Sequence, residues 1–156
     1  MTTFYGNKAK SPAFMPVDGC GIQLVDSIHM AANFTDGDLV NLLRVPAGTE
    51  LGQLKIRCDD LDSDGAPAIV FSVGYAPADA GSSLSAVADY FAAAGQTTAQ
   101  AGGTLDCSFE PIRFEEDCWI TLTVATKSAT FAAGDIYGIG YGAAVGPSGT
   151  GSTGAM

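Results

Sequence analysis

The segment Asp60–Gly65, with the sequence DLDSDG, carries the residues best suited to binding chemistry. Alternate carboxylates in a tight loop converge on one side, and the glycine allows the sharp turn that a calcium loop requires. A complete loop of this kind also has a bidentate Glu at its twelfth position, where this chain has Phe71. A plain acidic turn between strands would use the same residue types, because Asp and Gly favour turns for backbone reasons. Asp60, Asp62 and Asp64 are therefore candidate Ca²⁺ ligands, and no other cofactor is expected.

A second acidic cluster, Glu115-Glu116-Asp117, raises the question of acid and base catalysis. Glycoside hydrolysis needs two carboxylates that flank one bond. Consecutive residues of a strand point to opposite faces, so this cluster favours a solvated turn instead. The sequence has one histidine, His29, and it lacks a phosphate loop, an H-E-x-x-H motif and a nucleophile elbow. The protein is therefore not expected to be an enzyme, and carboxylate-only chemistry is the one enzymatic alternative.

The charge balance argues against nucleic acid as a partner. The chain has 7 Lys and Arg against 17 Asp and Glu, a formal net charge of −10, whereas phosphate binding needs clustered cations. No apolar run reaches the ~18 residues of a membrane span. The first residues lack the charged-then-apolar order of a signal peptide. Synthesis in a cytoplasm, without a membrane partner, is the expectation.

The four cysteines are far apart in the sequence and form no C-x-x-C pair, which leaves zinc and redox functions without support from spacing. They are Cys20, Cys58, Cys107 and Cys118. Free cysteines are among the most buried residues, so buried thiols are predicted. One cross-strand disulfide remains an alternative.

Period-two patterns predict a β-sheet domain. Leu54, Ile56 and Cys58 alternate with polar residues, and the apolar run Ile69–Val73 follows the acidic segment, which predicts a hairpin over residues 51–75. Arg44, Lys55 and Arg57 are expected on the solvent face of adjacent strands, either paired with acids or docked to another subunit. Ile136–Gly142 predicts a last strand, with Tyr137, Ile139 and Tyr141 on one face and glycines that leave room on the other.

One helix is predicted, over residues 83–95. Ser82 or Ser83 can cap its first N–H groups, Leu84, Val87 and Phe91 share a face, and Gly95 can end it in a left-handed conformation.

These elements predict an all-β fold: a two-sheet antiparallel β-sandwich, jelly-roll-like, with one short inserted helix and extended terminal arms. At 156 residues the chain suits a single core. The expected organisation is an extended N-terminal arm over residues 1–19, a β-sandwich domain over residues 20–145, and a tail over residues 146–156 rich in Gly, Ser and Thr.

The segment Leu42–Thr49, followed by Leu54-Lys55-Ile56, an acidic turn and the late strand Ala133–Gly140, resembles small structural proteins of tailed bacteriophages. The resemblance extends from Asp38 to Ala143 as a pattern of strands and turns. It implies a head decoration or cement protein, a β-sandwich that is often trimeric and sits on the outside of the capsid. The implied partners are the major capsid protein and further copies of the chain, in a virion assembled in the host cytoplasm.

The N-terminal arm is the expected capsid-binding segment, because its aromatic side chains are suited to anchoring an interface. Phe4, Tyr5 and Phe14 would be apolar anchors, and Lys8 and Lys10 would meet acidic capsid groups.

Two further alternatives stay open. A calcium-dependent carbohydrate- or receptor-binding module would use the Asp60–Gly65 loop, and a head-fibre or head-to-tail component would belong to the same structural class.

Overall fold

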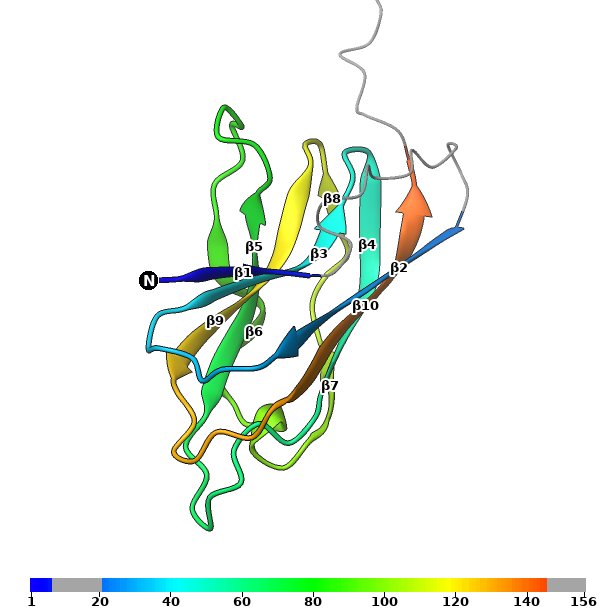
Figure 1. The fold of residues 1–156 in the computed structure, drawn as a ribbon. Coiled ribbons are helices and arrows are strands. Elements are labelled where there is room, and N and C mark those ends of the chain that lie inside the picture. Colours follow the sequence, from blue (N-terminus) through cyan, green and yellow to red (C-terminus); the bar gives the residue numbers. More distant parts are fainter. Residues whose placement is uncertain (7–20, 146–156) are drawn as a thin grey trace, which may run out of the picture.

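The computed structural model describes residues 1–6 and 21–145, which form two β-sheets packed face to face (Figure 1). Sheet A runs in the order β1 (Thr3–Tyr5), β3 (Leu39–Val45), β9 (Cys118–Thr126), β5 (Val70–Pro77), β6 (Val87–Gln96). Sheet B runs in the order β2 (Gly21–Met30), β10 (Gly134–Ala144), β4 (Thr49–Cys58), β7 (Gly103–Cys107), and β8 (Ile112–Phe114) also pairs with β4. Among the described strands the pairing is antiparallel except between β1 and β3. The predicted all-β sandwich is confirmed.

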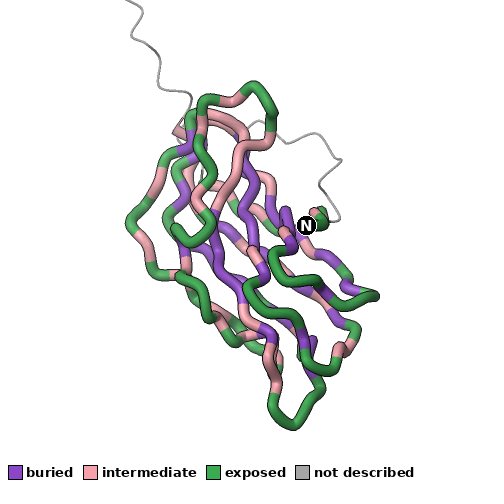
Figure 2. Tube along the Cα trace, turned by 90° about the vertical axis from the view of Figure 1, so that its left-hand side faces the viewer, coloured by how far each residue is buried: buried purple, intermediate pink, exposed green. Residues whose placement is uncertain are grey.

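The core lies between the two sheets and is built from one face of each strand. Figure 2 shows the buried positions running along the inside of the strands. The glycines of β10 are part of this packing: a Cβ on Gly138 would lie 3.0 Å from Leu42, and one on Gly140 would lie 3.1 Å from Leu51. Leu42 and Leu51 are fully buried. The room that the glycines were predicted to leave is thus filled by leucines of β3, in the opposite sheet, and of the neighbouring strand β4.

The predicted hairpin over residues 51–75 is wrong. β4 belongs to sheet B and β5 to sheet A, so the acidic segment between them crosses from one sheet to the other. Leu61 is fully buried within this crossing, and Asp62 forms an isolated antiparallel bridge with Phe131. A simple turn between two strands is exposed to solvent, whereas part of this connection is buried.

The predicted helix over residues 83–95 is also wrong, because the chain from Val87 onward is strand β6. It pairs with β5 through Tyr75↔Val87 and Val73↔Ala92, with register shifts between the pairs. Pairing with a neighbouring strand overrides the helix propensity of an alanine-rich segment. Gly95 does have a positive φ of 102°, as predicted, but within a strand. The short helical element within residues 21–145 is the 3₁₀ turn η1 (Thr98–Gln100).

The first six residues are part of the sandwich. β1 extends the edge of sheet A, where Thr3 pairs with Leu39 and Tyr5 with Asn41. The N–H of Thr2 donates to the buried Asp38 carboxylate (2.7 Å). The rest of the predicted arm, and the predicted tail, lie outside the described residues.

Candidate functional site

Asp62 is the central carboxylate of the acidic segment, and its side chain is buried. Its Oδ2 accepts N–H groups from Ala68 (2.7 Å), Ile69 (3.1 Å) and Ala129 (2.9 Å), and its Oδ1 accepts the N–H of Thr130 (2.9 Å). One side chain therefore joins the β4–β5 crossing to the β9–β10 connection. A buried carboxylate with several backbone donors is a common way to hold two loops together.

The pKa of Asp62 reflects two opposing causes. Burial raises it, because desolvation disfavours the charged form, but the backbone donors favour the carboxylate more strongly. The pKa of Asp62 is consequently held well below its usual range. The group is ionised at neutral pH, as its four donors require.

The two flanking carboxylates also stabilise the local loop. Asp60 Oδ1 accepts the N–H of Asp62 (3.0 Å). Asp64 accepts the N–H of Ala66 (2.8 Å) and the hydroxyl of Thr130 (2.9 Å). Within residues 1–6 and 21–145 no group of three His, Cys, Asp or Glu side chains is arranged to hold a metal ion. Each carboxylate of the motif accepts at least one hydrogen bond from the chain itself.

This geometry leads to a prediction about calcium. Because the three carboxylates already accept hydrogen bonds from the chain, we expect no dependence of stability on Ca²⁺. Thermal unfolding of the purified protein should give the same Tm with excess EDTA and with millimolar Ca²⁺. Chelation with EGTA serves as a second control. A Tm that rises with Ca²⁺ in the wild type and not in Asp64→Ala would contradict this expectation and restore the calcium interpretation.

The carboxylates of Glu115, Glu116 and Asp117 are directed to different partners. Asp117 forms an ion pair with Arg44 (2.7 Å), and Glu115 forms one with the arginine of β8 (2.9 Å). Glu116 accepts hydrogen bonds from the side chains of Ser82 and Ser83 and from the N–H of Ser83, and these lower its pKa. The cluster therefore connects the β8–β9 turn to β3 and to the β5–β6 connection.

Of the cysteines, Cys58, Cys107 and Cys118 lie in the described part of the chain, and all three are free. Burial raises the pKa of Cys58 to about 12 and that of Cys107 to about 11, and it also raises the pKa of Cys118. These thiols are therefore protonated and unreactive at neutral pH. The prediction of buried free thiols is confirmed for Cys58 and Cys118, and Cys107 is half-buried. Cys20 lies outside the described residues.

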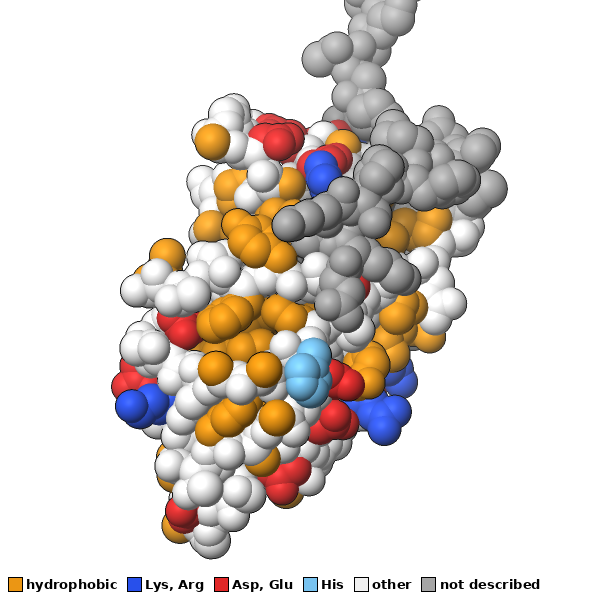
Figure 3. Space-filling view, in the orientation of Figure 1, with side chains coloured by type: hydrophobic (Ala, Val, Ile, Leu, Met, Phe, Trp, Pro, Cys, Tyr) orange, Lys and Arg blue, Asp and Glu red, His pale blue; other side chains and the backbone are white. Residues whose placement is uncertain are grey.

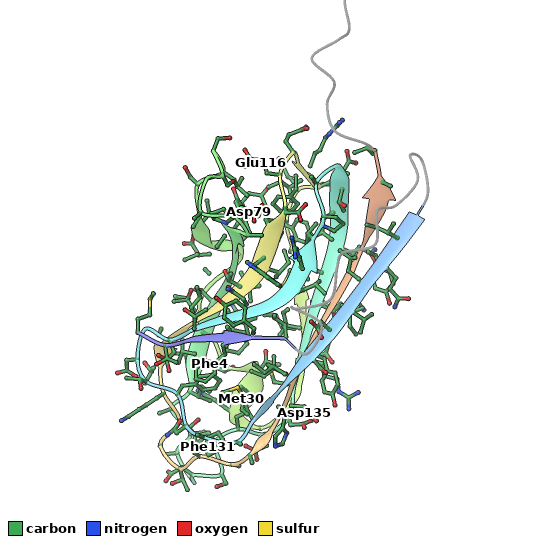
Figure 4. The ribbon with its side chains drawn as sticks, turned by 45° about the horizontal axis from the view of Figure 1, so that its top comes forward. Phe4, Met30, Asp79, Glu116, Phe131 and Asp135 are labelled. Atoms are coloured by element: carbon green, nitrogen blue, oxygen red, sulfur yellow. The ribbon has the colours of Figure 1, made fainter. Side chains whose placement is uncertain are left out.

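The arm residues predicted to bind a capsid differ in their placement. Phe4 packs edge-on against Phe34, with ring centroids 5.7 Å apart, and lies on the same side of the body as Met30 (Figure 4). Tyr5 lies edge-on to Trp119 at 5.9 Å and keeps 53% of its surface exposed. Phe4 thus contributes to the chain's own core, whereas Tyr5 offers a surface. Lys8, Lys10 and Phe14 lie outside the described residues.

The three cations expected on one solvent face are divided between the sheets. Arg44 is on β3 of sheet A, whereas Lys55 and Arg57 are both on β4 of sheet B. The expectation of a shared face therefore holds for Lys55 and Arg57 and is wrong for Arg44. The reason is that the chain passes from sheet A to sheet B between β3 and β4, so these two consecutive strands lie in different sheets.

No helix among the described residues is long and apolar enough to span a membrane. The fold and its acidic side chains define a class of protein: a two-sheet β-sandwich in which carboxylates hold the connections between strands together.

Comparison with solved structures finds similar folds in chains of phage capsids. The chain is similar to one from the capsid of Ralstonia phage GP4, with a TM-score of 0.69 and 23% identity over 91% of this chain and 97% of that chain. It is also similar to a chain of the cyanophage Pam1 capsid asymmetric unit, with a TM-score of 0.63 and 25% identity over 88% of this chain and 96% of that one. The sequence matches no protein-family model, and no curated protein matches it.

Proposed function

We propose that the chain is a non-enzymatic structural protein of a tailed-phage virion, which decorates the outside of the capsid and stabilises it. The observation that carries the proposal is the extent of the structural match. The Ralstonia phage GP4 alignment takes in 91% of this chain and 97% of the other. The match therefore takes in nearly the whole of the capsid chain that was compared.

The charge of the chain supports a position outside the shell. A formal net charge of −10 repels packaged DNA and favours solubility at an exterior surface. The partner is the major capsid protein, and copies of the chain associate with one another, with a trimer favoured. Many copies acting together convert modest single contacts into strong reinforcement of a lattice.

The N-terminal arm makes the capsid contact in this proposal. Tyr5 is the described aromatic residue of the arm that keeps a large exposed surface, and Lys8 and Lys10 supply positive charge next to it in the sequence. Phe4 and Phe14 are the other proposed anchors, although Phe4 also packs against Phe34. Deleting the arm is a poor test, because residues 3–5 are a strand of sheet A.

Binding to heads tests the proposal. Heads of the phage that encodes the chain are prepared without it, mixed with purified protein and sedimented. We expect saturable binding of the wild type and a higher disruption temperature of the heads. The double variant Lys8→Glu/Lys10→Glu should bind about tenfold more weakly or worse, since like charges then meet at the interface.

Lys127→Glu, which reverses one lysine where the double variant reverses two, is the control for charge reversal outside the arm, because Lys127 is exposed and lies at the β9–β10 connection. It should bind heads as the wild type does. Wild-type protein that fails to bind heads would contradict the proposed function, and normal binding by the arm variant would contradict the role of the arm. Electron microscopy of the decorated heads distinguishes a lattice-wide cement from a head-fibre or head-to-tail component at one vertex.

A further inference from the structure

The first residue before β1 is held by a buried carboxylate, that of Asp38. Asp38 is 2% exposed; its Oδ1 accepts the N–H of Thr2 (2.7 Å), and its Oδ2 accepts the N–H of Thr35 (2.8 Å). The N–H of Leu39 donates in turn to the carbonyl of Thr2 (3.0 Å). Thr2 is therefore bonded through both its N–H and its carbonyl to two consecutive residues, Asp38 and Leu39.

The position of the Asp38 carboxylate is fixed by other parts of the fold. The N–H of Asp38 donates to the carbonyl of Thr35 (3.0 Å), and its carbonyl accepts the N–H of Val124 on β9 (2.9 Å). The N–H of Gly37 donates to the carbonyl of Val124 (2.8 Å). The turn before β3 and strand β9 thus hold the carboxylate in place, and the nitrogen of Thr2 meets an acceptor that is already oriented.

Strand β1 gains from a strong bond at this end because it is short. It has three residues and lies at the edge of sheet A. Figure 3 shows hydrophobic side chains along the path of β1 across this face of the molecule. Phe4 and Tyr5 make their ring contacts with Phe34 and Trp119 from this strand. A stronger bond at Thr2 would hold both rings against the body.

The charge of Asp38 shows which kind of bond would be stronger. The N–H of Thr35 lowers the pKa of Asp38, and this effect exceeds the opposing effect of burial, so the group is ionised at neutral pH. Its two described donors, from Thr35 and Thr2, are neutral backbone N–H groups. A buried carboxylate is stabilised most by a cationic donor, whose hydrogen bond is roughly twice as strong as that of a neutral one.

Met1 is the residue that keeps the nitrogen of Thr2 neutral, because it is joined to it by a peptide bond. Met1 is 92% exposed, and Figure 1 shows this end of the chain at the outer edge of the molecule. We propose that the Met1–Thr2 bond is a processing site, and that its hydrolysis gives Thr2 an α-ammonium group that forms an ion pair with Asp38.

The reaction is the hydrolysis of one amide. Water adds across the bond, the carbonyl carbon of Met1 leaves as a carboxylate, and the nitrogen of Thr2 becomes an amine that takes up a proton at neutral pH. In a chain that starts at Met1, the enzyme class that does this is a methionine aminopeptidase, which requires a small second residue such as threonine. The carbonyl of Thr2, which accepts the N–H of Leu39, is unchanged.

Mass spectrometry and thermal unfolding of the full chain test the two parts of the proposal. Protein expressed from Met1 should have a mass lower by one methionine residue, and retention of Met1 overturns the processing site. Three forms are then compared at pH 7: one that starts at Met1, one released from a cleavable fusion so that it starts at Thr2, and this second form acetylated on Thr2. We expect Tm to be about 2–5 °C higher for the free Thr2 amine than for the other two.

The acetylated form keeps an N–H for Asp38 and removes only the charge, so equal Tm values for it and the free amine overturn the ion pair. Asp38→Asn should abolish the difference between the free and acetylated forms, and a difference that persists in this variant also overturns the ion pair. Asp36→Asn is the matched control: Asp36 is an exposed residue of the same turn that accepts the N–H of Lys127 (2.8 Å), and the difference should remain. The acetylated wild type carries no substitution, so the test stands even where Asp38→Asn fails to fold.

Discussion

Replacing Asp62 with alanine is expected to lower the free energy of unfolding by about 3–5 kcal/mol. The substitution removes the acceptor for the N–H groups of Ala68, Ile69, Ala129 and Thr130, and each buried donor left without a partner costs about 1–3 kcal/mol. The summed effect is reduced because water can reach some of these groups once the carboxylate is gone. A loss of this size is a large part of the ~5–15 kcal/mol that stabilises a typical domain. Urea denaturation followed by Trp119 fluorescence measures it.

Asp64→Ala is the matched control for this prediction. Asp64 belongs to the same acidic motif, but it is exposed, and its carboxylate oxygens accept hydrogen bonds from Ala66 and Thr130 at the surface. We expect a loss of about 1 kcal/mol or less, the size of an exposed hydrogen bond. Equal losses for Asp62→Ala and Asp64→Ala would show that the buried carboxylate is not what holds the two loops.

The same carboxylate makes stability depend on pH. The pKa of Asp62 is lowered in the folded state, so the unfolded chain binds its proton more readily. Its contribution is fully present above about pH 4, the ordinary pKa of Asp, and is lost as the pH falls further. In Asp62→Ala, this decrease of the free energy of unfolding at acidic pH should be absent. Asp38, whose pKa is also lowered, retains a smaller dependence of the same sign.

Alternation of side chains made much of the fold predictable. The last strand was expected over Ile136–Gly142, inside the observed bounds of β10, because a strand with one buried face has a period of two whatever its neighbours are. The face shared by Tyr137, Ile139 and Tyr141 follows from the same period. The residues of β4 that lie beside them could not be predicted from this period, because strand order is set by contacts between residues distant in sequence, such as Ile139 with Lys55.

The acidic segment shows where local patterns stop being informative. The sequence DLDSDG is equally suited to a calcium loop and to a turn, and its actual use depends on the N–H groups of Ala129 and Thr130, more than sixty residues away. The signal that could have indicated this was Leu61, an apolar residue within an otherwise polar turn. A leucine at this position favours burial in a hydrophobic core, and Leu61 is fully buried.

Replacing Gly74 with alanine is expected to lower the free energy of unfolding by about 3 kcal/mol or more. A Cβ at this position would lie 1.9 Å from the carbonyl oxygen of Val87 and 2.4 Å from the carbonyl carbon of Ala88. Both are backbone atoms of β6, so no side-chain rotation relieves the clash. The start of β6 would have to move away from β5, and the hydrogen bond from Ser72 to the carbonyl of Ala88 (2.8 Å) would be lost. For a chain of this size the expected decrease in Tm is about 6–12 °C.

Gly52→Ala is the matched control, because Gly52 also lies in a strand, β4, and a Cβ there meets nothing within 4 Å. It should leave Tm nearly unchanged or raise it slightly, since alanine restricts the unfolded chain. Hydrogen exchange gives the residue-level measurement: in Gly74→Ala the amides of β6 should lose protection before those of β9, which keeps its pairing with β3. The comparison also distinguishes a strand from a helix at residues 87–96. A helix would not bring the backbone of Val87 onto Gly74, so equal Tm values for Gly74→Ala and Gly52→Ala would contradict β6 as a strand paired with β5.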